Sequence, residues 1–150
     1  MLHPINRGDW DRTVWCGPGV LSILTGKPVR ETHAILGRHC GTTAEKVSAV
    51  PIEAILLALY EQDFLVREVD LAARYSKPPT LRRYLRERPM LPERLKMVLV
   101  LTHEHVGACH LNYYCDNHTQ VVMHQDNCLG GRRPVEQAWI LTPIPPADSQ

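Results

Sequence analysis

Cys16 is the residue of this chain whose type and position point most directly to covalent chemistry. It begins the apolar segment CGPGVLSILT, whose composition predicts a helix over residues 16–25 that ends at Gly26. A thiol at a helix N-terminus faces unpaired backbone N–H groups and the positive end of the helix dipole, and both favour the nucleophilic thiolate. Pro18 fits this position because the first helical turn does not use its missing N–H. We therefore take Cys16 as the candidate nucleophile.

A base for this thiol has to come from a distant segment. Residues 109–115 (CHLNYYC) and 120–124 (QVVMH) are rich in β-favouring types and flank the turn DNHT, so they predict a hairpin. Because a hairpin brings its two ends together, we expect His110 to lie beside Asp126.

The predicted catalytic set is therefore Cys16, His110 and Asp126, in which the imidazole activates the thiol and the carboxylate orients the imidazole. Asn127 is the alternative orienting residue, since a neutral amide also accepts the imidazole proton. His124 is the second candidate for the base. His103, His105 and His118 are placed in loops or turns, where solvent-exposed polar roles suffice for them.

These motifs resemble the papain-like cysteine peptidase superfamily. The similarity is closest to the C39-like, bacteriocin-processing type of peptidase and to small phage or bacterial proteins related to it. It is carried by Cys-Gly-Pro-Gly at residues 16–19, a later strand-opening histidine and an aspartate one hairpin further on; residues 24–36 and 133–141 are also similar to segments of such domains. The resemblance implies a papain-like fold, a peptide or protein substrate, and hydrolysis or acyl transfer on a peptide, isopeptide or side-chain amide with no metal or other cofactor.

The chain departs from this family at the oxyanion hole. Papain-like enzymes usually place a glutamine about a turn and a half before the cysteine, whereas residues 6–12 (NRGDWDR) contain none. Asn6 is the replacement we expect, together with the backbone N–H of Cys16, and Trp15 and Gly17 are the candidate walls of the substrate cleft. Because loss of one oxyanion donor costs on the order of 100- to 1000-fold in rate, the alternative is a catalytically inactive binding or inhibitor protein. Such a protein would be phage-derived and would act on a host protein.

The elements that must position these residues form an α+β pattern in a single domain over residues 1–150, with residues 143–150 as a tail. Helical signals come first and strands follow, so we expect N-terminal helices packed on a C-terminal antiparallel sheet. The predicted helices cover residues 16–25, 28–38, 50–60 and 80–87, and the predicted strands outside the hairpin cover residues 64–69, 97–102 and 139–141.

Composition and charge argue against several other classes of protein. The net charge of +1 argues against a nucleic-acid partner, and the arginines of residues 82–94 are interrupted by Glu87 and Glu93, which favours a solvated face. No apolar run reaches the length of a membrane span, and residues 1–7 lack the apolar core of a signal peptide. Five cysteines without framework spacing indicate free thiols in a cytoplasmic protein. A zinc site in the Cys- and His-rich segment 103–128 is a third interpretation, which the absence of paired ligand spacing disfavours.

Overall fold

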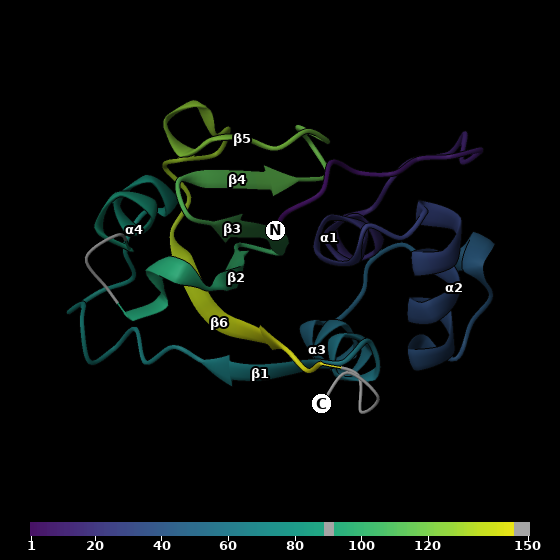
Figure 1. Cartoon of the computed structure of the whole chain (residues 1–150), viewed down its shortest axis with the longest axis horizontal. Helices are drawn as coiled ribbons and strands as arrows, with labels where there is room; N and C mark the ends of the chain where they lie inside the picture. Colours follow the sequence, from purple (N-terminus) through teal and green to yellow (C-terminus); the bar gives the residue numbers. More distant parts are fainter. Residues whose placement is uncertain (89–91, 146–150) are drawn as a thin grey trace.

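Three helices near the N-terminus precede all the strands and form one layer of the molecule. The computed structural model describes residues 1–88 and 92–145. Figure 1 shows the three helices on one side of a twisted sheet. They are α1 (Cys16–Thr25), α2 (Val29–Cys40) and α3 (Ile52–Glu61), with the short 3-10 turn η1 (Ala44–Lys46) between the last two. Of these bounds, those of α1 agree fully with the sequence prediction.

The second layer is a six-stranded sheet in which all neighbouring strands are antiparallel. Its order is β1-β6-β2-β3-β4-β5. The strands are β1 (Phe64–Glu68), β2 (Met97–Thr102), β3 (His105–His110), β4 (Tyr113–Asp116), β5 (Met123–His124) and β6 (Val135–Pro143). The remaining helical segments are α4 (Leu81–Glu87) and the 3-10 turns η3 (Pro92–Leu95) and η4 (Gln125–Asn127). The α+β layout expected from the sequence, with N-terminal helices packed on an antiparallel sheet, is confirmed.

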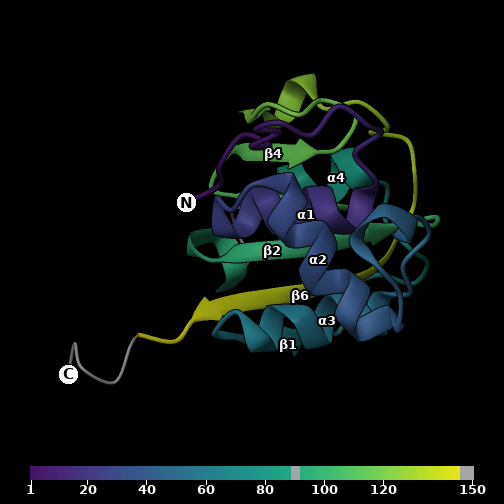
Figure 2. The ribbon, with the colours of Figure 1, turned by 90° about the vertical axis from the view of Figure 1, so that its right-hand side faces the viewer.

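The two faces of the sheet bury two separate apolar clusters. Because side chains alternate along a strand, Met97 and Leu99 of β2 pack with α1, α2 and α3, whereas Val98 and Val100 pack with Tyr84 of α4. Figure 2, turned by 90° from Figure 1, shows α1 and α2 lying in front of the central strands. The sheet is therefore covered on both faces, and α1 is held against β3 and β4.

Helix α1 begins without a side-chain cap, which bears on its chemistry. Trp15 is the N-cap residue and provides no side-chain hydrogen bond to the first turn. The helix ends at Gly26, whose left-handed φ of 76° lets its N–H reach the Ser22 carbonyl. The eight residues from Gly17 to Leu24 are all buried. The N-terminus of α1 is thus fixed in the core while its first N–H groups stay available.

The hairpin differs from the one predicted. β3 starts at His105, and the chain turns at Leu111, which has a φ of 54°, so the predicted strand 109–115 is divided between β3 and β4. The preceding turn contains Glu104 at a φ of 52°. Neither turn carries glycine at its left-handed position, although that is the residue that normally marks such turns.

Two further expectations need correction. Pro143 is part of β6, where it is the partner of Phe64, and the N–H of Ile144 donates to the Asp63 carbonyl at 2.7 Å. The predicted tail 143–150 therefore begins later than expected, and residues 146–150 lie outside the described part. In the arginine-rich segment, Arg88 is fully buried and donates to the Leu111 carbonyl, so it is not part of a solvated face.

Candidate active site

Cys16 lies at the junction of the two layers, where α1 meets the start of β3. The side chain of His105 and the backbone N–H groups of Val106 and Gly17 are the groups near its thiol that stabilise the thiolate. Partial burial alone would raise the thiol pKa, but the bonds to His105, Val106 and Gly17 and the charge of His105 together hold it below its ordinary value. This environment favours the thiolate.

His105 connects the thiol to a buried carboxylate. Its Nε2 lies 3.0 Å from Oδ2 of Asp116, and both side chains are almost fully buried. Because the imidazole has two nitrogens and Nε2 is held by Asp116, Nδ1 is the one left for the thiol. Burial opposes the protonated ring, but the bonds and charges of Asp116 and Cys16 outweigh it and raise the pKa of His105 to about 9. His105 is therefore an imidazolium at neutral pH.

Asp116 stays ionised in spite of its burial. Burial raises its pKa, but His105, the backbone N–H of Thr119 and the hydroxyl of Tyr114 stabilise the carboxylate and hold the pKa at about 2. The Tyr114 hydroxyl donates to Oδ2 at 3.0 Å, and the N–H groups of His118 and Thr119 donate to Oδ1 at 2.9 and 3.0 Å. The carboxylate is thus oriented by four donors.

Gly107 makes room for one of these donors. A Cβ at this position would overlap the phenol ring of Tyr114 on the neighbouring strand. The absence of a side chain in β3 therefore lets the Tyr114 ring cross the strand and lets its hydroxyl reach Asp116.

The turn after β4 joins the carboxylate to the segment that precedes the nucleophile. Asn117 Nδ2 donates to the Val14 carbonyl at 2.9 Å, and the N–H of Ile5 donates to the Gln120 carbonyl at 3.0 Å. These bonds therefore hold the segment before Cys16 against the turn after Asp116, although the two are far apart in the sequence.

A cleft of about 820 Å³ opens over the thiol. Trp15 lines it and is 43% exposed, so the expectation that Trp15 forms a cleft wall agrees with the geometry. Gly17 does not line it. A Cβ on Gly17 would press against Val50 and Leu36 inside the core, so this glycine serves the close packing of α1, and only its N–H faces the thiol.

The structure does not bring His110 to Cys16. His105 and His110 stand at opposite ends of β3, and five residues of strand span about 17 Å. The pKa of His110 is lowered by burial and by the positive charges of the N-terminal amine and Arg88, which is unlike the environment of a base paired with a carboxylate. The predicted pairing of Cys16 with His110 is thus replaced by Cys16 with His105.

Asp126 and Asn127 lie in η4, and both are exposed. The carboxylate of Asp126 is 3.5 Å from Nδ1 of His124, so its nearest imidazole is that one and not His110. η4 follows the edge strand β5, so the residues after the predicted hairpin lie at the edge of the sheet. The hairpin therefore does not bring Asp126 beside His110. Asp116, and not Asp126, is the carboxylate beside the imidazole that faces Cys16, whereas His124 lies beside Asp126.

Asn6 is also displaced from its predicted role. Its side-chain amide donates to the Gly26 carbonyl at 3.4 Å, at the C-terminal end of α1, while Cys16 is at the N-terminal end. Asn6 therefore cannot hold an oxyanion beside the thiol.

Two carboxamides line the cleft instead, Gln120 and Asn117, and the amide of Asn117 is already bonded to the Val14 carbonyl. Oε1 of Gln120 accepts from Arg7 at 3.4 Å, and because arginine only donates, this bond fixes the oxygen and leaves Nε2 as a free donor. Its backbone has a φ of 59°, a conformation that costs free energy for a residue with a side chain and that often occurs at functional sites.

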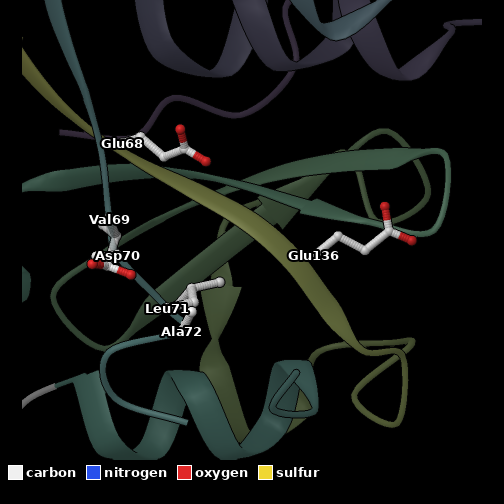
Figure 3. A pocket seen from close by; sticks show the side chains of 6 residues that line it. All are labelled: Glu68, Val69, Asp70, Leu71, Ala72 and Glu136. Atoms are coloured by element: carbon white, nitrogen blue, oxygen red, sulfur yellow. The ribbon is translucent and has the colours of Figure 1, made fainter. Parts of the chain in front are cut away.

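A second hollow, of about 370 Å³, lies beside β1 and β6 (Figure 3). The side chains around it are carboxylates or small apolar groups and include no thiol or imidazole: Glu68, Val69, Asp70, Leu71, Ala72 and Glu136. This hollow therefore lacks the thiol and imidazole that line the Cys16 cleft.

Among residues 1–88 and 92–145, no group of three or more His, Cys, Asp or Glu side chains is arranged to hold a metal ion. The Cys- and His-rich segment that raised the zinc interpretation is instead divided between the buried strands and the exposed turns of the sheet. Over the same residues, no helix combines the length and the apolar character needed to cross a bilayer.

Comparison with solved structures gives the same fold. The peptidase domain of Streptococcus ComA, a bifunctional ABC transporter involved in a quorum-sensing pathway, is similar with a TM-score of 0.54 at 18% sequence identity; the match covers 95% of this chain and 100% of that domain. A double-glycine motif protease from an AMS/PCAT transporter, solved with its leader peptide, matches with a TM-score of 0.50 at 10% identity, over 96% and 93% of the two chains. No family model and no curated protein matches the sequence. The predicted resemblance to C39-like, papain-like peptidases is confirmed in the fold.

Proposed function

We propose that this protein is a cysteine peptidase-like hydrolase or acyl transferase that uses Cys16, His105 and Asp116 as a catalytic triad. The observation that carries the proposal is the arrangement of three side chains at the cleft. Cys16 and His105 line it together, and Nε2 of His105 lies 3.0 Å from the buried carboxylate of Asp116. The pKa of the thiol is lowered and that of the imidazole is raised to about 9, as this arrangement requires. Nucleophile, base and orienting group are the parts that thiol catalysis needs.

The proposed reaction is acyl transfer. The Cys16 thiolate attacks an amide carbonyl carbon, and the oxyanion is held by the backbone N–H at the start of α1 and by the side-chain amide of Gln120. His105 gives its proton to the leaving amine, which leaves a thioester on Cys16. His105 then takes a proton from water as that water attacks the thioester, so that the acid is released and the thiol regenerated. Another amine in place of water would give transamidation.

The substrate we propose is a peptide or protein segment, cut at a backbone, isopeptide or side-chain amide. Support comes from the open cleft of about 820 Å³, which leaves room for an extended chain, and from the peptidases that share the fold, one of which was solved with a leader peptide. The phage origin, the host-protein partner and the cytoplasmic location stay predictions.

The alternative function, an inactive binding or inhibitor protein on the same scaffold, was motivated by the missing glutamine before the cysteine. A binding scaffold needs no buried ion pair beside a thiol, whereas Asp116 here accepts from His105 and from three further donors. The geometry therefore favours the enzyme.

The first test is brief labelling with limiting iodoacetamide at pH 6, followed by intact-mass analysis and peptide mapping. Cys16 should be alkylated ahead of the other four cysteines, because thiolate is the reacting form. Cys40 is exposed and controls for access, while burial raises the pKa of Cys109, Cys115 and Cys128. The Cys16→Ala variant should keep its fold and lose the fast label. Equal labelling of Cys16 and Cys40 would contradict the triad and support the binding protein.

A further inference from the structure

A second imidazole, which the triad does not use, lies flat against the first. The rings of His105 and His118 are stacked, with centroids 4.7 Å apart and planes inclined by 19°. His118 lines the cleft over Cys16, and its own side chain is exposed. One face of the His105 ring is therefore covered by a side chain that is itself open to solvent.

The position of His118 is fixed by the same carboxylate that orients His105. Asp116 accepts the His118 backbone N–H on Oδ1 at 2.9 Å and the His105 ring on Oδ2 at 3.0 Å. Because both bonds end on one buried carboxylate, the two imidazoles are set relative to each other and not brought together by chance. A short Asx turn of this kind holds its backbone firmly.

The stack supplies a restraint that the triad bonds lack. The bond to Asp116 holds Nε2 but leaves the His105 ring free to tilt about the line from Nε2 to the thiol. A flat ring at van der Waals distance resists that tilt and keeps water from the His105–Asp116 bond.

We propose that His118 is a positioning residue for His105: its ring keeps the imidazole aligned on Cys16. The inference rests on the proposed thiol chemistry, and it assigns the alignment of the base to a residue outside the triad.

The test compares alkylation rates of Cys16 by iodoacetamide between pH 4.5 and 9 in the full chain. His118→Ala should lower the rate by about two- to tenfold near pH 7, the factor that corresponds to loss of one aromatic pair. His118→Phe keeps a flat ring, so it should restore the rate near pH 7. His124→Ala is the matched control, because His124 is exposed and lies against an aromatic ring, Tyr113, outside the cleft.

Each outcome is decisive. A His118→Ala rate equal to the wild type at every pH, with wild-type Cys16 still reacting fast, would overturn the positioning role and leave the triad standing. Slow labelling of Cys16 in the wild type would instead remove the triad and this inference with it. If His118→Ala does not fold, the comparison of His118→Phe with His118→Leu still decides, because equal rates with a flat ring and with a branched chain would overturn the role of the stack.

Discussion

At the scale of single residues, the site depends on how a buried carboxylate is kept charged. Asp116 is only 2% exposed, and an isolated carboxylate there would be protonated. Three donors and the facing imidazolium reverse that preference and hold its pKa at about 2. The negative charge then raises the pKa of His105, and the imidazolium in turn lowers that of Cys16. Asp116 thus influences the ionisation of the Cys16 thiol indirectly, through His105.

Replacing Asp116 with asparagine tests this chain of effects. The pKa of His105, raised to about 9 in the native protein, should fall, because the charge that stabilises the imidazolium is gone. His105 is protonated below its pKa, so the alkaline limb of Cys16 reactivity should move to lower pH. Alkylation of Cys16 at pH 7 should drop by at least about tenfold, the factor for one pKa unit. An unchanged alkaline limb would show that Asp116 does not set the charge of His105.

The role of Gln120 is tested by separating alkylation from acylation. Alkylation by iodoacetamide forms no oxyanion, whereas acylation by a small activated ester does. Gln120→Ala should therefore leave alkylation of Cys16 unchanged and slow its acylation by on the order of 100-fold. The control is Asn6→Ala, whose amide contacts Gly26 at the far end of α1. Equal acylation rates for Gln120→Ala and the wild type would leave the backbone N–H groups as the only oxyanion donors.

At the scale of elements, the sequence prediction succeeded where a pattern has a local cause. The bounds of α1 and β2 were predicted correctly, since a Gly26 stop and an uninterrupted apolar run are local signals. It failed at β3 and β4, because the turns that bound these strands contain Glu104 and Leu111 in left-handed backbone conformations. Neither residue type predicts such a conformation.

The error in the hairpin then decided the choice of base. Cys16 was identified from its own helix, but a shift of the strand start from His105 to Cys109 moved the histidine expected at that end to His110. The signals that could have found the site are the apolar run between His105 and His110 and the aspartate at the end of residues 113–116. Both signals fit a hairpin of β3 and β4 with a tight turn at Leu111. The position of that turn becomes clear only from the pairing of the two strands.

A stacked pair also joins the N-terminal arm to α2. Trp10 and His33 stack with centroids 4.1 Å apart, and His33 is 1% exposed. Burial lowers the pKa of His33, which opposes protonation of the folded state. Because its folded pKa lies below the unfolded one, this contribution to stability is present above about pH 6.5 and is lost as the pH falls below it.

His33→Phe should remove this acid sensitivity while keeping the stack. The variant should match or exceed the wild type in melting temperature at pH 8, and its advantage should grow by a few degrees at pH 5, the scale of a change near 1 kcal/mol in a domain of this size. Thermal unfolding followed by circular dichroism at the two pH values gives the comparison. An advantage that does not change between pH 8 and pH 5 would show that His33 is not the group that titrates.

At the scale of the whole molecule, the site exists only where the two layers meet. The thiol comes from the helical layer, and the imidazole and carboxylate come from the sheet. The central strands carry both apolar clusters, with neighbouring residues of β2 and β6 contributing to opposite faces. If the packing of one cluster were lost, the central strands on which the other cluster also packs would be exposed. This favours unfolding of the chain as a single cooperative unit.

This coupling predicts that the reactive thiol and the fold disappear together. In a urea titration at pH 6, a short pulse of iodoacetamide should label Cys16 selectively up to the midpoint of the far-ultraviolet circular dichroism transition and lose selectivity there. The His105–Asp116 pair can lower the thiol pKa only while α1 is packed on β3 and β4. Tryptophan fluorescence reports Trp10 and Trp15 near the helical layer and Trp139 in β6, and it should give the same midpoint. Selectivity lost well before the dichroism change would mean that the helical layer separates from an intact sheet, so that the chain is two folding units with the active site at their boundary.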